Sequence, residues 1–169
     1  ETALSWTRIE TPFYFLNSIA LTSHAIFCSD RDLGIMRSVD NGGSWETVNT
    51  GLPSTRISGL FTTPAGAVWS SGRLGIQQWS DGENAWHRPS AGPGFVQMLE
   101  LTIAPDGEFF ASTTDGLFRS ADRGVRWSRS DTTLPSGPTQ HMTAGTTSAD
   151  LFAWGDGAYR STDGGAHWT

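Results

Sequence analysis

The chain of 169 residues contains no lysine and a single cysteine, Cys28. One thiol excludes an internal disulfide framework and any zinc cluster built on cysteine ligands. The 11 positive charges are all arginines, are outnumbered by 17 acidic side chains, and form no basic run. Because nucleic-acid binding needs clustered basic residues, this balance argues against a nucleic-acid partner. No apolar stretch approaches the roughly 18 residues of a membrane-spanning helix, so we expect no transmembrane segment in this chain.

Signals for metal and cofactor binding are also lacking. The four histidines show no HExxH motif or other spacing typical of zinc ligands: His24, His87, His141 and His167. The run Asp40-Asn41-Gly42 has the start of a calcium loop but lacks the further oxygen ligands and the closing glutamate that such a loop needs. No glycine-rich phosphate loop is present. The sequence therefore predicts neither a metal ion nor another cofactor.

What the sequence does contain is a repeat of 41 residues. It is marked by four glycines at that spacing, each followed eleven residues later by a tryptophan: Gly34, Gly75, Gly116 and Gly157, then Trp45, Trp86, Trp127 and Trp168. Each unit holds four short stretches in which apolar and polar residues alternate, which is the period of a strand. Glycine and proline turns separate these stretches, and no helical period appears.

A four-stranded antiparallel unit of about 40 residues is the size of one β-propeller blade. The sequence therefore predicts an all-β propeller that forms one domain over residues 1–169. The predicted blades span residues 11–48, 52–89, 93–130 and 134–169, and residues 1–10 form a leading outer strand. Either that strand completes the last blade and closes a four-bladed ring, or the four units are an arc of a larger propeller, which we prefer. An open arc would leave two sheet edges that a partner must cover.

The turn after the third stretch carries the motif Ser-x-Asp-x-Gly-x-x-Trp. It is intact in three units, and the second unit keeps only the Asp and the Trp: Ser38, Asp40, Gly42 and Trp45; Asp81 and Trp86; Ser120, Asp122, Gly124 and Trp127; Ser161, Asp163, Gly165 and Trp168. An aspartate in a tight turn can accept hydrogen bonds from backbone N–H groups, and glycine supplies a positive φ. The tryptophan can cover the turn and lie against the neighbouring sheet. We therefore predict a structural motif, with a looser turn in the second unit.

This motif resembles the Asp-box, or BNR repeat, of sialidases, sortilin-type receptors, two-propeller xyloglucan hydrolases and photosystem II assembly factors. The full pattern, Gly-apolar-aromatic-Arg-Ser-x-Asp-x-Gly-x-x-Trp, is most similar to the assembly-factor and sortilin types rather than to true sialidases. In those families the box lies on the propeller face away from the binding or catalytic centre. The resemblance implies an extracytoplasmic protein, whether periplasmic, lumenal or secreted. For the assembly-factor type it also implies docking on a membrane complex.

The opposite face would be formed by the loops that join the second and third stretches of each unit. The candidate ligand residues on these loops are Asp30, Arg31, Asp32, Arg73, Asp115 and Asp156. The simpler interpretation is that they are solvated turn residues. Glycoside hydrolysis needs two carboxylates that face each other at roughly 5 to 9 Å. Asp30 or Asp32 could pair with Asp115 or Asp156 only if their blades face one another, and the sequence does not fix that distance.

Another polar column recurs at the same offset in every unit: Arg37, Gln78, Arg119 and Arg160. Its simplest role is repeat geometry, through bonds to carbonyls or to the box aspartate of the next unit, and the alternative is an inward ring that captures an anion. Cys28 stands at an apolar position, so we expect a buried core thiol rather than a nucleophile.

The fold accounts for nearly every repeated residue, and no catalytic set is left over. A sialidase would need three clustered arginines and a tyrosine nucleophile, but the chain has only Tyr14 and Tyr159, and Tyr159 stands in a packing column. We therefore predict a non-catalytic binding or scaffold module for a protein partner or a larger complex, with a glycan as a further ligand class. The alternative is part of a glycoside hydrolase of the xyloglucanase or sialidase kind, with carboxylate acid–base catalysis and some catalytic residues outside this chain.

Overall fold

The computed structural model describes residues 14–89, 98–130, 141–147 and 149–169, and every regular element in these ranges is a strand. No helix that could cross a membrane occurs in this part of the chain. The leading outer strand predicted over residues 1–10 lies outside the described residues. Blade 1 consists of β1 (Leu16–Leu21), β2 (Ile26–Asp30), β3 (Gly34–Ser38) and β4 (Glu46–Thr47). Blade 2 consists of β5 (Ile57–Thr62), β6 (Val68–Gly72), β7 (Gly75–Ser80) and β8 (Ala85–His87).

Blade 3 consists of β9 (Met98–Ile103), β10 (Phe109–Thr113), β11 (Gly116–Ser120) and β12 (Ser128–Arg129). Blade 4 has β13 (His141–Ala144), β14 (Leu151–Trp154) and β15 (Ala158–Ser161). Each sheet is an antiparallel meander in which strands pair in chain order. In blade 4, Thr169 and Arg160 exchange two backbone hydrogen bonds of 2.9 Å. This is the pairing with which β12 begins in blade 3, so Thr169 is equivalent to Ser128.

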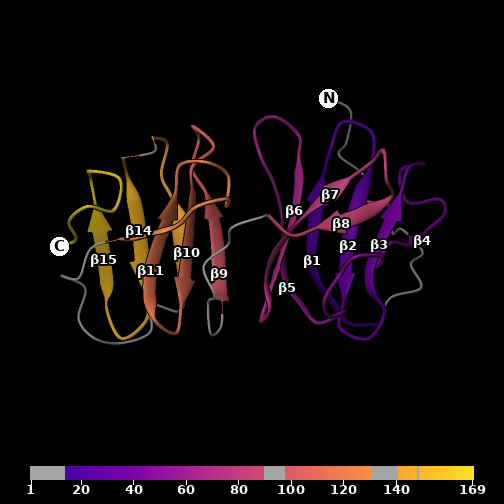
Figure 1. Cartoon of the computed structure of the whole chain (residues 1–169), viewed down its shortest axis with the longest axis horizontal. Helices are drawn as coiled ribbons and strands as arrows, with labels where there is room; N and C mark the ends of the chain where they lie inside the picture. The colour runs from indigo at the N-terminus through magenta and orange to yellow at the C-terminus, as the bar shows by residue number, and fades with distance from the viewer. Residues whose placement is uncertain (1–13, 90–97, 131–140, 148) are drawn as a thin grey trace, which may run out of the picture.

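The first strands of successive blades contact one another. Figure 1 shows β3 and β4 of blade 1 toward one end of the molecule and β14 and β15 of blade 4 toward the other. β1 packs beside β5, β5 beside β9, and β9 beside β13. Among the described strands, those of blade 4 make no extensive contact with blade 1. This radial order of four-stranded antiparallel sheets confirms the predicted propeller fold. It also places every loop between a second and a third strand at the end of the blades opposite the turns between third and fourth strands, which carry the Ser-x-Asp-x-Gly-x-x-Trp motif.

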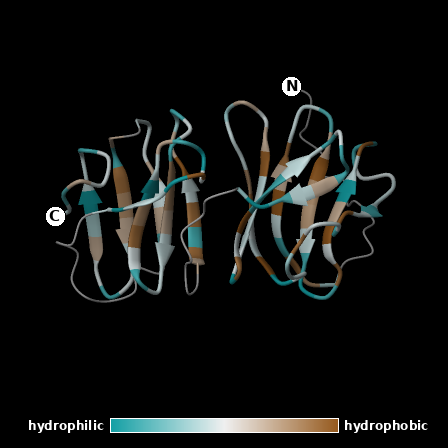
Figure 2. Ribbon diagram, viewed as in Figure 1, coloured by the Kyte–Doolittle hydropathy of each residue, from teal (hydrophilic) through white to brown (hydrophobic). Residues whose placement is uncertain are grey.

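The hydrophobic core is divided into three clusters, one between each pair of successive blades. Phe27 of blade 1 meets Trp79 and Trp86 of blade 2 edge-on, with ring centroids 5.6 and 6.3 Å apart. Trp69 of blade 2 meets Phe109 of blade 3 at 4.8 Å. The third cluster, between blades 3 and 4, is built around Phe110, Leu117, Met142, Leu151 and Trp168. Hydrophobic segments accordingly lie within the strands in both halves of Figure 2. Large rings thus fill the wedges between sheets.

The connection from blade 1 to blade 2 passes close to the outer strand of blade 2. The indole N–H of Trp86 donates to the carbonyl of Val48 at 2.7 Å, and its backbone N–H donates to the carbonyl of Thr50 at 2.9 Å. Gly51 lies directly over the carbonyl of Trp86 and has a φ of 85°. A side chain at Gly51 would therefore collide with backbone as well as strain its own φ.

This close approach predicts that two glycine substitutions lower the unfolding free energy by different amounts. Gly66 has a nearly equal φ of 82°, but a Cβ atom there would meet nothing within 4 Å. Gly66→Ala should lose about 1 kcal/mol of unfolding free energy from the left-handed backbone alone. Gly51→Ala should lose roughly 1 to 3 kcal/mol more, because the segment must move away from Trp86. Urea denaturation of both variants measures the difference, and equal losses would contradict the packing described here.

Candidate functional site

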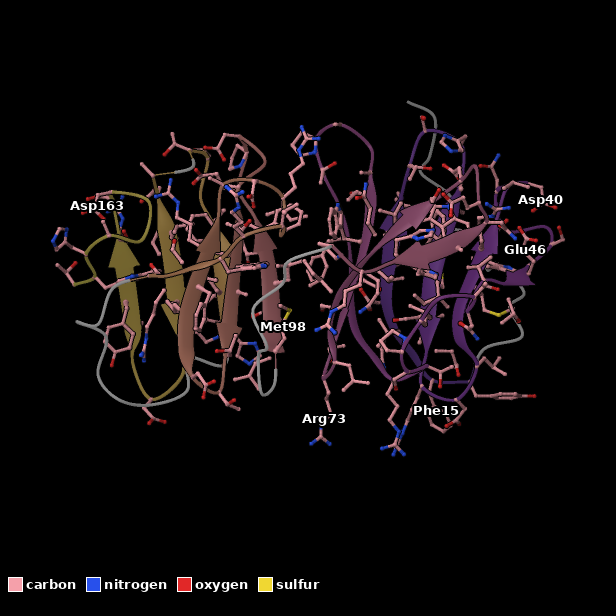
Figure 3. All side chains as sticks on the ribbon, viewed as in Figure 1. Phe15, Asp40, Glu46, Arg73, Met98 and Asp163 are labelled. Atoms are coloured by element: carbon pink, nitrogen blue, oxygen red, sulfur yellow. The ribbon has the colours of Figure 1, made fainter. Side chains whose placement is uncertain are left out.

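The three intact Ser-x-Asp-x-Gly-x-x-Trp turns, which we call the boxes, share one hydrogen-bond network. In blade 1, Ser38 Oγ donates to Asp40 Oδ1 at 2.8 Å and accepts the N–H of Gly42 at 2.8 Å. Asp40 Oδ1 also accepts the N–H of Ser44 at 2.8 Å. The same bonds recur in the other two boxes, with Ser120, Asp122, Gly124 and Arg126, and with Ser161, Asp163, Gly165 and His167. Figure 3 shows Asp40 and Asp163 in turns at the two ends of the molecule.

In blade 2, a different side chain donates the hydrogen bond to the turn aspartate. Trp79 stands where the other units have the box serine, and its indole N–H donates to Asp81 Oδ1 at 2.7 Å. The expectation of a looser turn is wrong: residues 81–84 alone separate β7 from β8, whereas residues 39–45 separate β3 from β4. Without the box serine and glycine, the strands stay paired up to Ser80 and Ala85. The indole ring then serves both the turn and the core.

The box tryptophans join their turns to the cores between blades. Trp127 and Trp168 donate their indole N–H groups to the carbonyls of Gly124 and Gly165, at 3.0 and 3.2 Å. Trp127 packs against the cluster between blades 2 and 3, and Trp168 belongs to the cluster between blades 3 and 4. These contacts fix the turns against the cores, so the box residues have a structural role.

Hydrogen bonds keep the box carboxylates ionised. The hydroxyl and the N–H of Ser44, followed by the hydroxyl of Ser38, lower the pKa of Asp40 to about 2. The N–H and ring of His167 hold the pKa of Asp163 well below its usual range. The pKa of Asp122 is also lowered, chiefly by the N–H of Arg126. An ionised carboxylate accepts these bonds more strongly than a protonated one, so folding and deprotonation favour each other.

The recurrent arginine column also forms ion pairs. Arg37 binds Glu46 at 2.6 Å and reaches Asp81, the box aspartate of the next blade, at 3.4 Å. This confirms the predicted bond to a neighbouring box for Arg37. In the later units the pairs stay within one blade, with Arg119 bound to Glu108 and Arg160 bound to Asp150. Each of the three guanidinium groups thus has a carboxylate partner. The column therefore stabilises the repeated units.

Of the predicted ligand face, Asp30 is buried. Its Oδ2 accepts the N–H of Phe15 at 3.0 Å, and its Oδ1 accepts those of Asp32 and Leu33 at 2.8 and 3.0 Å. Burial raises the pKa of Asp30, but the backbone donors together outweigh it and leave the pKa below its usual value. This carboxylate therefore caps its own turn and anchors the start of β1.

The other five residues of the predicted face are exposed on the loops between second and third strands: Arg31, Asp32, Arg73, Asp115 and Asp156. Arg73 projects from the end of blade 2 into solvent (Figure 3). The structure brings Asp30 and Asp32 into one turn, and no hydrogen bond or ion pair joins any of the six described side chains across blades. They form a polar rim rather than a converged site.

Sequence reasoning missed a cavity of about 280 Å³ beside this rim, which we call the axial pocket. It lies where the first strands of the blades begin. Its lining residues are Ser18, Ser58, Gly59, Phe61, Ser71, Leu99, Glu100 and His141. Ser71 is buried and its hydroxyl has no hydrogen-bond partner. Glu100 Oε2 accepts the N–H of Met142 at 2.8 Å and lies 3.5 Å from Nδ1 of His141. Strand periodicity could not reveal that these positions converge.

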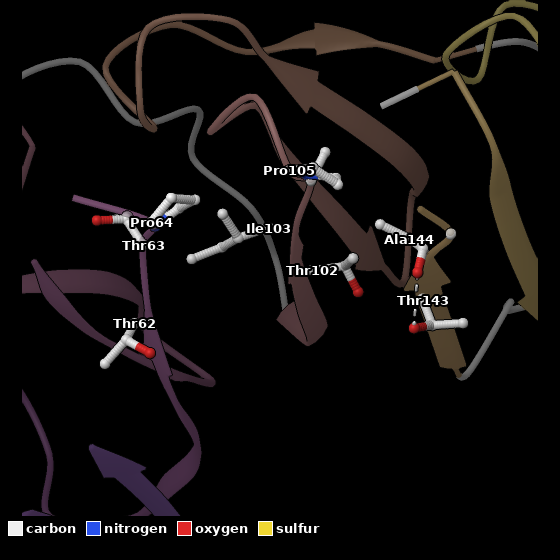
Figure 4. A pocket seen from close by; sticks show the side chains of 10 residues that line it. Thr62, Thr63, Pro64, Thr102, Ile103, Pro105, Thr143 and Ala144 are labelled. Atoms are coloured by element: carbon white, nitrogen blue, oxygen red, sulfur yellow. Dashed lines mark hydrogen bonds between the residues drawn. The ribbon is translucent and has the colours of Figure 1, made fainter. Parts of the chain in front are cut away.

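A second hollow of about 390 Å³ lies at the opposite ends of β5, β9 and β13 (Figure 4). Its lining is threonine, proline and small apolar residues, with no ionisable side chain. In the described ranges, no three His, Cys, Asp or Glu side chains gather closely enough to hold a metal ion. The axial pocket is therefore the better candidate for binding.

Comparison with known proteins defines the class by fold. No protein-family profile and no curated protein matches the sequence. The structure resembles YCF48 bound to a D1 peptide (TM-score 0.72, 17% identity), covering 98% of this chain and 56% of that one. It resembles the GH74 xyloglucanase of Xanthomonas campestris (TM-score 0.68, 17% identity), covering 89% and 29%. Virginiamycin B lyase of Staphylococcus aureus is also similar (TM-score 0.69, 14% identity), covering 91% and 54%.

The chain is thus similar to part of each of these β-propeller proteins, because it spans less than two thirds of the length of each. Their chemistries differ, and at such low identity the similarity establishes the propeller fold alone. A role must be argued from the residues of this chain.

The depressed pKa of the box aspartates predicts a loss of stability in acid. A carboxylate whose pKa is lower in the folded state stabilises the fold above its unfolded pKa, near 4, and loses that contribution as pH falls through the folded value. For Asp40 the window runs from about pH 4 down to about 2. The melting temperature should therefore fall over that window. Asp40→Asn should lower it at pH 6 and flatten its fall, whereas Asp156→Asn, outside the boxes, should leave the slope unchanged. An unchanged slope in Asp40→Asn would count against the network.

Proposed function

We propose that this chain is a non-catalytic propeller module that binds protein and acts as a scaffold. The observation that carries the proposal is a difference in burial between equivalent positions of the repeat. One column of the first strands, spaced by 41 residues, consists of Ile19, Leu60, Leu101 and Met142. Their exposed fractions are 58%, 5%, 1% and 3%. The preceding blade covers this position in blades 2 to 4, whereas blade 1 has no described blade before it.

The same difference appears at the other end of the chain. An aromatic residue stands opposite the arginine or glutamine column in each blade: Phe27, Trp69, Phe110 and Phe152. Their exposed fractions are 1%, 2%, 1% and 38%. The next blade covers this residue in blades 1 to 3. In blade 4, Phe152 is exposed together with Trp154 on a face of the same design.

Both ends therefore carry one half of an interface that the chain makes three times internally. Leu21 and Phe15 extend the apolar surface of blade 1. Trp154 extends the apolar surface of blade 4 in the same way. Exposed apolar faces of this kind mark protein-interaction surfaces. Because each chain holds both halves, a second copy fits both ends, and we take it as the partner that these faces receive.

Two finer proposals rest on resemblance. The Asp-box pattern supports an extracytoplasmic location and docking on a membrane complex, and the structure of YCF48 with a D1 peptide supports peptide binding by a similar propeller. Fractionation of cells that express the natural gene tests the location. Recovery in the cytoplasm would contradict it.

A glycoside hydrolase is the second candidate, favoured by the similarity to xyloglucanases. Against it, the backbone N–H groups that bind the Asp30 carboxylate come from its own turn and from the start of blade 1. A carboxylate held in this way is ionised and inaccessible, so it suits neither the acid nor the nucleophile of such a reaction.

The end faces predict self-association through large apolar side chains. Analytical ultracentrifugation should show a mass that rises with concentration. Ile19→Asp and Phe152→Asp should each weaken association at least tenfold, because each places a charge in the interface. Leu74→Asp is the matched control, since Leu74 is also exposed but lies in a loop of blade 2. A chain that remains monomeric at every concentration would contradict self-association through these faces.

The non-catalytic assignment predicts no turnover of xyloglucan or sialylated glycans. Reducing-sugar release should stay at the level of the buffer across pH 4 to 8. Turnover that Asp30→Ala or Asp115→Ala abolishes, with the fold intact by circular dichroism, would establish the hydrolase instead.

A further inference from the structure

The axial pocket is formed by one position of the repeat, contributed by all four blades. Ser18, Gly59, Glu100 and His141 are spaced by 41 residues and all line it. In a propeller the first strands surround the axis, so equivalent positions on them converge. Each such position can therefore be compared with its three counterparts.

Two members of this column bridge to the first strand of the next blade. Ser18 Oγ accepts the N–H of Leu60 at 3.0 Å, and Glu100 Oε2 accepts the N–H of Met142 at 2.8 Å. Gly59 has no side chain with which to form the corresponding bridge. The repeat therefore lacks this bridge at blade 2, between two blades that have it.

Two side chains occupy the space beside Gly59. A Cβ atom at Gly59 would lie 3.3 Å from Ser71 Oγ but only 2.7 Å from the tip of the Phe61 ring, so the ring fills the space directly over Gly59 and the cavity lies beside it. Ser71 is almost fully buried, and its hydroxyl has no partner. A buried hydroxyl without a hydrogen bond is unfavourable, so a ligand atom that bonds to it is stabilised.

The charges of the pocket select the kind of ligand. Glu100 is its carboxylate, and no arginine lines it. Nδ1 of His141 lies 3.5 Å from that carboxylate, within the distance of an ion pair. A lysine ammonium or an arginine guanidinium only donates hydrogen bonds, and this lining offers a carboxylate and three serine oxygens as acceptors. The Phe61 ring adds a surface that attracts cations.

We propose that the axial pocket binds a cationic side chain, lysine or arginine, of a partner protein. Glu100 is the counter-ion, Ser71 accepts a hydrogen bond at the base, and Phe61 lies against the alkyl stem. This inference rests on the proposed protein-binding function but uses none of the end-face residues. The two can therefore fail separately.

The test is an amide NMR titration of the whole chain with three capped amino acids: the N-acetyl methylamides of lysine, arginine and norleucine. Lysine or arginine should shift the signals of Gly59, Ser71 and Glu100 saturably, and norleucine, which lacks the charge, should not. The two cationic probes show which side chain fits better. Equal shifts with norleucine, or no saturable shift with either cation, would overturn the proposal.

Three variants make the result specific. Glu100→Gln keeps an acceptor for the N–H of Met142 but removes the charge, so affinity should fall at least tenfold. Gly59→Ser introduces the residue that blade 1 has at this position and should also weaken binding, because its side chain must displace the Phe61 ring. Glu83→Gln removes an exposed charge in the box turn of blade 2 and is the control, with affinity unchanged.

Urea midpoints of the three variants confirm that they fold. Unchanged affinity in Glu100→Gln would overturn the proposal. So would a xyloglucan oligosaccharide that shifts the same signals more strongly than the cations, because the pocket would then be a sugar site. If self-association persists while both cations fail to bind, the scaffold stands and this inference alone is wrong.

Discussion

The constraint on which this structure depends is that each blade is a sheet with two apolar faces, and neither face can be covered by its own strands. Burial must therefore come from the neighbour, and it does so three times through aromatic rings wedged between blades. Phe27, Trp79 and Trp86 form one such wedge, with ring centroids 5.3 to 6.3 Å apart. The same constraint explains why Ile19 and Leu21 at one end, and Phe152 and Trp154 at the other, are exposed.

The box residues link the hydrogen bonds of each turn to the packing of the core between blades. In three blades a serine and an aspartate close the turn, and in blade 2 Trp79 supplies the hydrogen bond while its ring enters the core. A short-range motif thus tolerates replacement when the new residue offers a donor at the same place. Recognition groups lie elsewhere, at the axis, where the repeat varies from Ser18 to Gly59 and Glu100 without disturbing the sheets.

The strands, the turns and the box network could be predicted because they depend on residues close in the sequence. Alternation over a few residues and glycines at fixed spacing determine a meander locally. The axial pocket could not be predicted. Its column is formed by four different residue types, so it shows no sequence signal, and the buried state of Asp30 follows from a backbone contact with Phe15 that no spacing reveals.

By itself, the sequence determined a four-stranded unit, its repetition and the role of the box, since hydrogen bonds within a turn need no distant partner. Only the tertiary structure decided which equivalent residues are covered and which are exposed. Among the described residues, Leu60 has a preceding blade that covers it, whereas Ile19 does not and is exposed. The tertiary structure also decided that one position from each blade meets at the axis, because convergence is a property of how sheets are placed around a centre and not of any one of them.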